Sequence, residues 1–275
     1  LLYAIENELK SERTNSYYLP VKNMLEQIQK MAADKTGLLY NEIDARTGEI
    51  TRSGFSDCWG YNYYAYYTFY MVTGEKKFRD YVEKVLNNIH KFRGYRWEPR
   101  KDGSQSQDGY ADSIEGALGL LAHLPVQSAF DWVETEIQRL FAFQKEDGII
   151  EGWHGDGNFA RTALMYAFYK TRGLYCDPWR KDILLSAELT DDGLEIFIQA
   201  TRTWKGKICF DLPRHSKYLG MPENYPRINA FPEWFTIEPL GIYTIKPKDG
   251  KPVKILGENL IRGYKVKLKA NTPVR

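Results

Sequence analysis

The chain has 275 residues, of which 43% are hydrophobic, 27% charged and 15% aromatic. This is enough apolar material for one sizeable core, or for a helical domain with a smaller partner. The formal net charge is only +2, which argues against a nucleic-acid partner. The longest uncharged run, 58–74, is rich in tyrosine and too polar to rest in hydrocarbon. We therefore expect a soluble globular protein with no nucleic-acid and no membrane partner.

The 3 cysteines are scattered along the chain, and they form neither a CxxC pair nor a metal-ligand pattern with histidine. We therefore predict no bound metal and no cofactor. No signal peptide is visible, but the chain opens at Leu1 and 1–9 already has a helical pattern. This favours a sequence that begins inside a longer protein, whose missing N-terminal portion would be a partner of this chain.

Three segments carry apolar residues at helical spacing. The first, 21–31, follows a proline, and the others are 78–89 and 130–141. Each has a charged face, as an amphipathic helix on the surface of a domain has. For the third helix, Ser128 or Asp131 is a candidate N-cap.

Each amphipathic segment is followed by a second helical segment that is apolar on nearly every side. These segments are 61–72, 113–123 and 159–171, and they contain many small or aromatic residues. A helix that is apolar all round is buried. The sequence therefore predicts three repeated helix hairpins, with amphipathic helices outside and buried helices inside.

After residue 178 the pattern changes to alternation of apolar and polar residues. It is visible in 194–198 and in 205–210. Further on, Pro-Lys-Asp-Gly at 247–250 has the composition of a hairpin turn between two short apolar runs. These features predict short antiparallel strands in the last third of the chain.

A helical-hairpin domain over 1–178 followed by an antiparallel β domain over 179–275 resembles the (α/α) toroid carbohydrate-active enzymes. This group includes polysaccharide lyases and unsaturated uronyl hydrolases. Three hairpins would form only an open arc of such a toroid. The resemblance implies a site at the N-termini of the inner helices, an acidic oligo- or polysaccharide as partner, and a secreted or periplasmic location. Helix N-termini also favour carboxylates and hydroxyls for a physical reason, since they present free N–H groups and a positive dipole end.

The first inner-helix entry holds Trp59, Asn62 and Tyr63. Aromatic rings stack on sugar rings, and amides bind sugar hydroxyls. The alternative is structural, with Ser56 or Asp57 as an N-cap and the tyrosines in the core.

The second entry packs Asp108, Asp112 and Glu115 into eight residues around Tyr110. Spacings of three and four residues place carboxylates on one helix face, where they could divide acid and base roles. The alternative is capping, with Asp108 or Asp112 as N-cap and Glu115 completing a capping box.

The third entry combines Trp153, His154, Asp156, Asn158 and Arg161 with three glycines. Histidine is the side chain best suited to proton transfer near neutral pH. The alternative is a turn in which His154 and Asp156 cap the helix and Arg161 forms an ion pair with Asp or Glu.

Three functions are open on this basis. A lyase acting by β-elimination on a uronate-containing glycan would use His154 as base and Asn158 and Arg161 to neutralise the substrate carboxylate; this is the favoured hypothesis. A glycoside hydrolase of uronyl or unsaturated uronyl oligosaccharides would use the carboxylates. A non-catalytic glycan-binding or scaffold module is the third. The predicted catalytic residues are His154, Asp156, Asp108 and Asp112, and the predicted substrate-binding residues are Trp59, Asn62, Tyr63, Tyr110, Trp153, Asn158 and Arg161.

Overall fold

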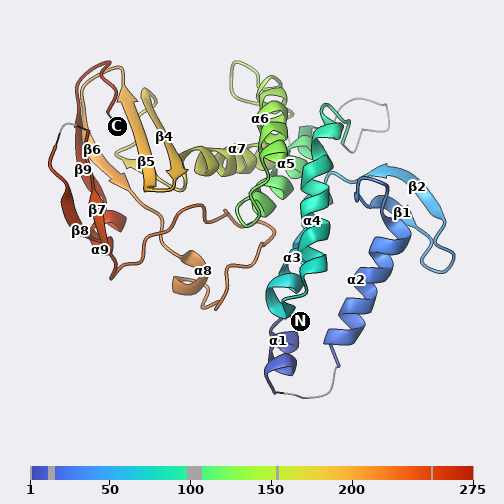
Figure 1. The fold of residues 1–275 in the computed structure, drawn as a ribbon. Helices are drawn as coiled ribbons and strands as arrows, with labels where there is room; N and C mark the ends of the chain where they lie inside the picture. Colours follow the sequence, from blue (N-terminus) through green and yellow to red (C-terminus); the bar gives the residue numbers. More distant parts are fainter. Residues whose placement is uncertain (1, 12–15, 98–106, 153–154, 249, 275) are drawn as a thin grey trace. The chain divides into compact units, whose positions relative to one another are not determined.

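The computed structural model describes residues 2–11, 16–97, 107–152, 155–248 and 250–274 (Figure 1). The helices of this part are α1 (Leu2–Ser11), α2 (Tyr18–Ala32), α3 (Trp59–Thr73), α4 (Lys76–Asn88), the 3-10 helix η1 (Ile89–Phe92), α5 (Gln107–Leu121), α6 (Gln127–Phe141), α7 (Gly155–Thr171), α8 (Arg214–Lys217) and α9 (Gly257–Ile261). The strands are β1 (Tyr40–Ile43), β2 (Ile50–Phe55), β3 (Tyr175–Asp177), β4 (Ile183–Thr190), β5 (Gly193–Ala200), β6 (Trp204–Cys209), β7 (Ile242–Ile245), β8 (Val253–Leu256) and β9 (Tyr264–Leu268).

The chain divides into two compact units. The first comprises Leu1–Ala163 and Tyr225–Ala230, and the second Leu164–Asn224 and Phe231–Arg275. The first boundary between the units thus falls inside α7, earlier in the chain than residue 178, and a short later segment returns to the first unit. Helices dominate the first unit and small antiparallel sheets the second, so the predicted change from helix to antiparallel strand is confirmed.

Two layers of helix make up much of the first unit. In one layer α3 packs against α5, and in the other α4 packs against α6; α4 also contacts α3, and α6 contacts α5 (Figure 1). The apolar stripe of 78–89 is buried as predicted, with the charged face of α4 outward. All three predicted amphipathic helices form. α4 and α6 bury their apolar faces, whereas in α2 only Leu25 and Ala32 are buried and Met24 is exposed.

Glycine lets α3 and α5 approach closely. A Cβ built on Gly60 would lie 2.4 Å from the backbone carbon of Gly116, so both positions require glycine. One turn further along, a Cβ on Gly119 would overlap the hydroxyl of Tyr64. The small residues of these helices are therefore explained by backbone contact inside the unit.

An aromatic core lies beside this crossing. The ring centroid of Trp59 is 6.4 Å from that of Trp97 and 6.0 Å from that of Trp132. Tyr63 is fully buried next to Trp59, and its hydroxyl donates to the backbone carbonyl of Gly37 at 2.6 Å. Stacked and edge-on ring pairs of this kind stabilise a core beyond their buried area.

Helix starts differ from the sequence prediction in three places. α6 is capped by Val126 without a side-chain hydrogen bond, so the predicted caps Ser128 and Asp131 were wrong. α3 is preceded by Cys58 rather than by a capping Ser56 or Asp57. The capping box predicted at 112–115 was also wrong, because α5 already begins at 107 and these residues lie inside it.

The hairpin β1–β2 was not predicted at all. Its second strand is mostly exposed and polar, so it lacks the alternation by which a half-buried strand is recognised.

The second unit is built from three small sheets in its described part. β3, β6 and β9 form one sheet with β6 in the middle, and β4–β5 and β7–β8 are antiparallel hairpins. The strands predicted over 194–198 and 205–210 and the hairpin around 247–250 are confirmed. Trp204, Ile208 and Leu268 belong to the buried core of this unit. Among the helices that the structure describes, none has the length and apolar character needed to cross a membrane.

Candidate functional site

Polar side chains from the starts of α3, α5 and α7 meet in the first unit. Asn158 on α7 donates through its side-chain amide to Asp108 on α5. Arg161, one turn further along α7, pairs with Asp112 on α5. Cys58, directly before α3, lies with its Sγ 3.9 Å from Oδ2 of Asp112. The three predicted helix entries therefore form one cluster.

Arg161 is at the centre of this cluster and is fully engaged. Its Nε donates to Oε2 of Glu115 at 2.5 Å, one Nη donates to Oδ1 of Asp112 at 3.3 Å, and the other Nη donates to Oδ1 of Asn229 at 2.5 Å. Asn229 comes from the short segment that returns to the first unit, and its φ of 58° is in the left-handed region. The ion pair between Arg161 and an acid is thus confirmed.

The carboxylates outnumber the cations here, and this shifts their protonation. Burial and then the neighbouring carboxylates raise the pKa of Asp112 to about 7, while Arg161 opposes the shift. These neighbours are Asp108, Asp57 and Glu115. Burial also raises the pKa of Glu115, whose side chain is 1% exposed, despite its contact with Arg161. Desolvation and like charge both disfavour an ionised carboxylate. A carboxyl with a pKa near 7 is half-protonated at neutral pH and suits proton transfer.

Asp57, which lies two residues before the start of α3, is a further acid of the cluster. One oxygen of Asp57, one of Asp112 and the Sγ of Cys58 lie within 4.8 Å of one another. The backbone N–H of Cys58 and the hydroxyl of Ser56 donate to Oδ1 of Asp57, which fixes this carboxylate. Two carboxylates and a thiol are also a donor set that a divalent cation accepts.

Tyr61 adds a hydroxyl to the same cluster. Burial raises the pKa of Tyr61 far above its usual range, and the carboxylates Glu115 and Asp112 contribute to the shift. Its hydroxyl therefore stays protonated at neutral pH, where it can donate a hydrogen bond but gives up its proton less readily than an ordinary tyrosine.

Asp156 has a different role from the one predicted. Its two carboxylate oxygens accept the backbone N–H groups of Ile150, Glu151 and Gly152, at 2.8, 3.0 and 2.6 Å respectively. The side chain thus holds the loop before α7 in place, as a negative charge in the first turn of a helix is suited to do. Trp153 and His154 lie outside the described residues.

Three of the aromatic side chains predicted to bind substrate lie in the core and not at the surface of the cluster. Trp59, Tyr63 and Tyr110 are 1%, 0% and 4% exposed. The packing alternative considered from sequence accounts for these three rings. Asn62 is exposed at the start of α3.

Five members of the cluster were absent from the predicted set of site residues: Asp57, Cys58, Tyr61, Glu115 and Asn229. Glu115 was noticed beside Asp112 but was not chosen. Cys58 and Tyr61 flank residues that were chosen, so proximity along the chain was a usable signal. Asn229 is 68 residues from Arg161, and nothing in the local sequence connects them.

Comparison of the chain with protein-family models, with curated proteins and with solved structures gives no significant match. The cluster must therefore be interpreted from its own chemistry.

Proposed function

We propose that the protein is a carbohydrate-active enzyme that hydrolyses a glycosidic bond in a uronate-containing glycan, with the carboxylates at the starts of α3 and α5 as its acid and base. The observation that carries this proposal is the burial of Asp112 beside further carboxylates, which raises its pKa to about 7. Glycosidases require a pair of acids whose environments drive their protonation states apart. The proposed architecture is an open (α/α) toroid-like arc, supported by the two helix layers α3–α5 and α4–α6.

In this mechanism Asp112 is the general acid. Half-protonated near neutral pH, it donates its proton to the oxygen of the leaving sugar as the glycosidic bond breaks. Asp57 attacks the anomeric carbon and forms a glycosyl ester, which water then hydrolyses with Asp112 as the base. An oxygen of Asp57 lies within 4.8 Å of an Asp112 oxygen. This is close to the shorter carboxyl separation of about 5 Å typical of glycosidases that retain configuration.

Asn158 and Arg161 position the acids. Asn158 holds Asp108 through its amide, and Arg161 fixes Asp112 and Glu115 relative to each other. Because its guanidinium is already engaged by two carboxylates and Asn229, Arg161 is poorly placed to neutralise a substrate carboxylate. This favours hydrolysis over β-elimination, which depends on such a neutralising group.

Lyase chemistry is the second candidate, and one observation favours it. The protonated hydroxyl of Tyr61 beside the cluster could donate to the 4-O leaving group of a uronate, with His154 as the base. The third candidate, a non-catalytic glycan-binding module, would use the same polar cluster without turnover.

The test is a panel of uronate-containing oligosaccharides, assayed in parallel for new reducing ends and for the ultraviolet absorbance of an unsaturated uronide. The proposal predicts new reducing ends without the absorbance, and loss of activity in Asp112→Asn. The matched control is Asp131→Asn, an exposed position on α6 whose carboxylate contacts only its own helix. Appearance of the absorbance would establish the lyase, and binding without turnover would establish the non-catalytic module.

A further inference from the structure

Four lysines face one another across two strands of the second unit. In the antiparallel pair β6–β9, Lys205 lies directly opposite Lys267, and Lys207 directly opposite Lys265. Side chains alternate between the faces of a strand, and residues in direct register share a face. All four lysines therefore lie on the same face of the sheet, while Trp204 on the other face is buried in the core. We call these four residues the lysine face.

Stability alone does not explain this arrangement. Like charges directly opposite in a sheet repel each other, and the pattern occurs twice in succession. Within the described residues, none of the four lysines forms an ion pair. β3 contributes a single acid to this face, Asp177, in register with Lys207.

Two of the four lysines, Lys265 and Lys267, also lie in a strongly basic part of the sequence. Residues 239–275 contain nine Lys and Arg and only two Asp and Glu, whereas the whole chain contains 38 and 36. The near-zero net charge of the protein therefore hides a strongly positive C-terminal segment. A surface of one sign concentrates ligands of the opposite sign.

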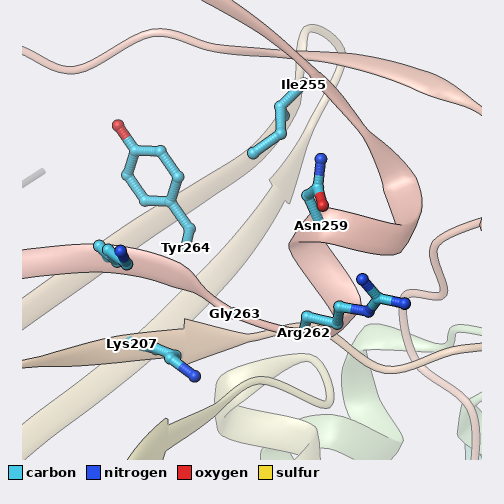
Figure 2. A pocket seen from close by; sticks show the side chains of 7 residues that line it. Lys207, Ile255, Asn259, Arg262, Gly263 and Tyr264 are labelled. Atoms are coloured by element: carbon cyan, nitrogen blue, oxygen red, sulfur yellow. The ribbon is translucent and has the colours of Figure 1, made fainter.

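A shallow pocket of about 470 Å³ adjoins the lysine face (Figure 2). Lys207 and Lys265 line it together with Arg262, the amide of Asn259 on α9, and Tyr264. Arg262 is paired with Glu258. The two lysines therefore supply the unpaired positive charge of the pocket.

Gly263 keeps the pocket open beside Lys207. It adopts φ +108°, and a Cβ there would lie 2.7 Å from Cβ of Lys207 and 2.9 Å from Sγ of Cys209. A side chain at this position would therefore displace Lys207. Figure 2 shows Lys207 and Arg262 close to Gly263, with Asn259 on the neighbouring helix.

We propose that the lysine face and its pocket bind a chain of anionic polysaccharide, with a sugar carboxylate in the pocket and further carboxylates along the lysines. Cations meet the carboxylates, and Asn259 offers the amide that sugar hydroxyls require. The choice of this polymer rests on the proposed function, since the first unit would cleave the same polymer. The binding itself does not depend on turnover.

The test measures binding of the full chain to polygalacturonate by calorimetry at low salt, with neutral dextran and a single-stranded oligonucleotide as comparison ligands. The variant is Lys207→Gln/Lys265→Gln, and the matched control is Lys30→Gln/Lys84→Gln, two exposed lysines of α2 and α4. We expect roughly tenfold weaker binding in the variant and a shallower salt dependence, because fewer counterions are released. The control should bind as the parent does.

The thermal midpoint gives a second readout. Polygalacturonate should raise the thermal midpoint of the parent more than that of the variant. Unchanged affinity in the variant, equal binding of dextran, or tighter binding of the oligonucleotide would each overturn the proposal. Absence of turnover with normal, lysine-dependent binding would refute the proposed hydrolase and leave this inference standing.

Discussion

Two regions of the molecule leave their charges unbalanced in opposite ways. At the starts of α3 and α5, the carboxylates Asp57, Asp108, Asp112 and Glu115 surround a single arginine. On β6 and β9, four lysines face one another with one acid in register. Pairing of opposite charges is the arrangement that stability favours, so regions that break it are where function is expected.

The difference between the two regions is burial. Glu115 is 1% exposed, so charge in the acidic cluster is desolvated and its interactions are strong. Three of the four lysines are exposed, so their repulsion is screened by water and salt. The same kind of imbalance therefore costs much more free energy in the helical unit than in the sheet. We expect the largest effects of substitution in the acidic cluster and the smallest on the lysine face.

The largest expected effect is on catalysis. If the proposed hydrolase is correct, Asp112→Asn should reduce turnover of the glycan by about 10²–10⁴-fold, because it removes the proposed general acid. In the parent, activity should fall as the pH rises through about 7, the pKa of Asp112, since the acid is lost by ionisation. A rate profile without an alkaline limb near this pH would contradict the assignment.

Removal of the central cation should be the most destabilising change. Arg161→Met leaves Glu115 buried and unpaired, which costs about 3–5 kcal/mol of unfolding free energy. Arg161→Met/Glu115→Leu should recover most of that loss, because no unpaired charge remains at this pair. Urea unfolding of the two variants measures the difference, and equal stability of both would refute the explanation of this pair.

Asp112 should also make stability depend on pH. Its pKa in the folded protein, about 7, is above the unfolded value of about 3.9, so the folded state binds more protons between these values. Stability of the parent therefore falls as pH rises from about 4 to 7. Asp112→Asn should be more stable than the parent at pH 8, by at most about 4 kcal/mol, with the advantage vanishing near pH 4. An advantage independent of pH would contradict this.

The helix crossing gives a steric comparison. Gly60→Ala should destabilise the first unit by about 1–3 kcal/mol, since its methyl meets the backbone of Gly116, which cannot move independently. Gly157→Ala is the matched control, because a Cβ there meets nothing within 4 Å. It should stabilise α7 by up to about 1 kcal/mol. Thermal melting of both variants tests the opposite signs.

The smallest expected effect concerns the lysine face. Lys205→Gln/Lys267→Gln should raise the unfolding free energy by about 0.2–1 kcal/mol at low salt, because it removes one directly opposed pair. The gain should shrink at high salt. A loss of stability would show that these lysines have stabilising partners.

Much of the fold could be predicted from the sequence because its elements are periodic. The apolar stripe in 78–89 predicts a helix with one buried face, and the all-apolar segment 61–72 predicts a buried helix. The structure has α4 and α3 at these positions. β1–β2 could not be predicted, since the exposed second strand has no buried face to leave a pattern.

The candidate site was only partly predictable, for the same reason. An all-apolar helix has no periodicity to show which of its sides faces a neighbouring helix, so nothing in the sequence distinguished the buried Trp59 and Tyr63 from surface residues. The acids of α5 were found because carboxylates in an apolar helix are unusual. Asn229, which Arg161 contacts from a distant segment, depends on tertiary folding alone.

The central claim is that the acidic cluster holds Asp112 half-protonated at neutral pH, and this can be measured without knowledge of the substrate. The experiment is a carbon-13 NMR titration of the side-chain carboxyls in protein labelled at aspartate, with Asp112→Asn to assign the resonance. We predict that this resonance titrates with a midpoint near 7. A midpoint near 4, the value of an exposed aspartate, would contradict the claim.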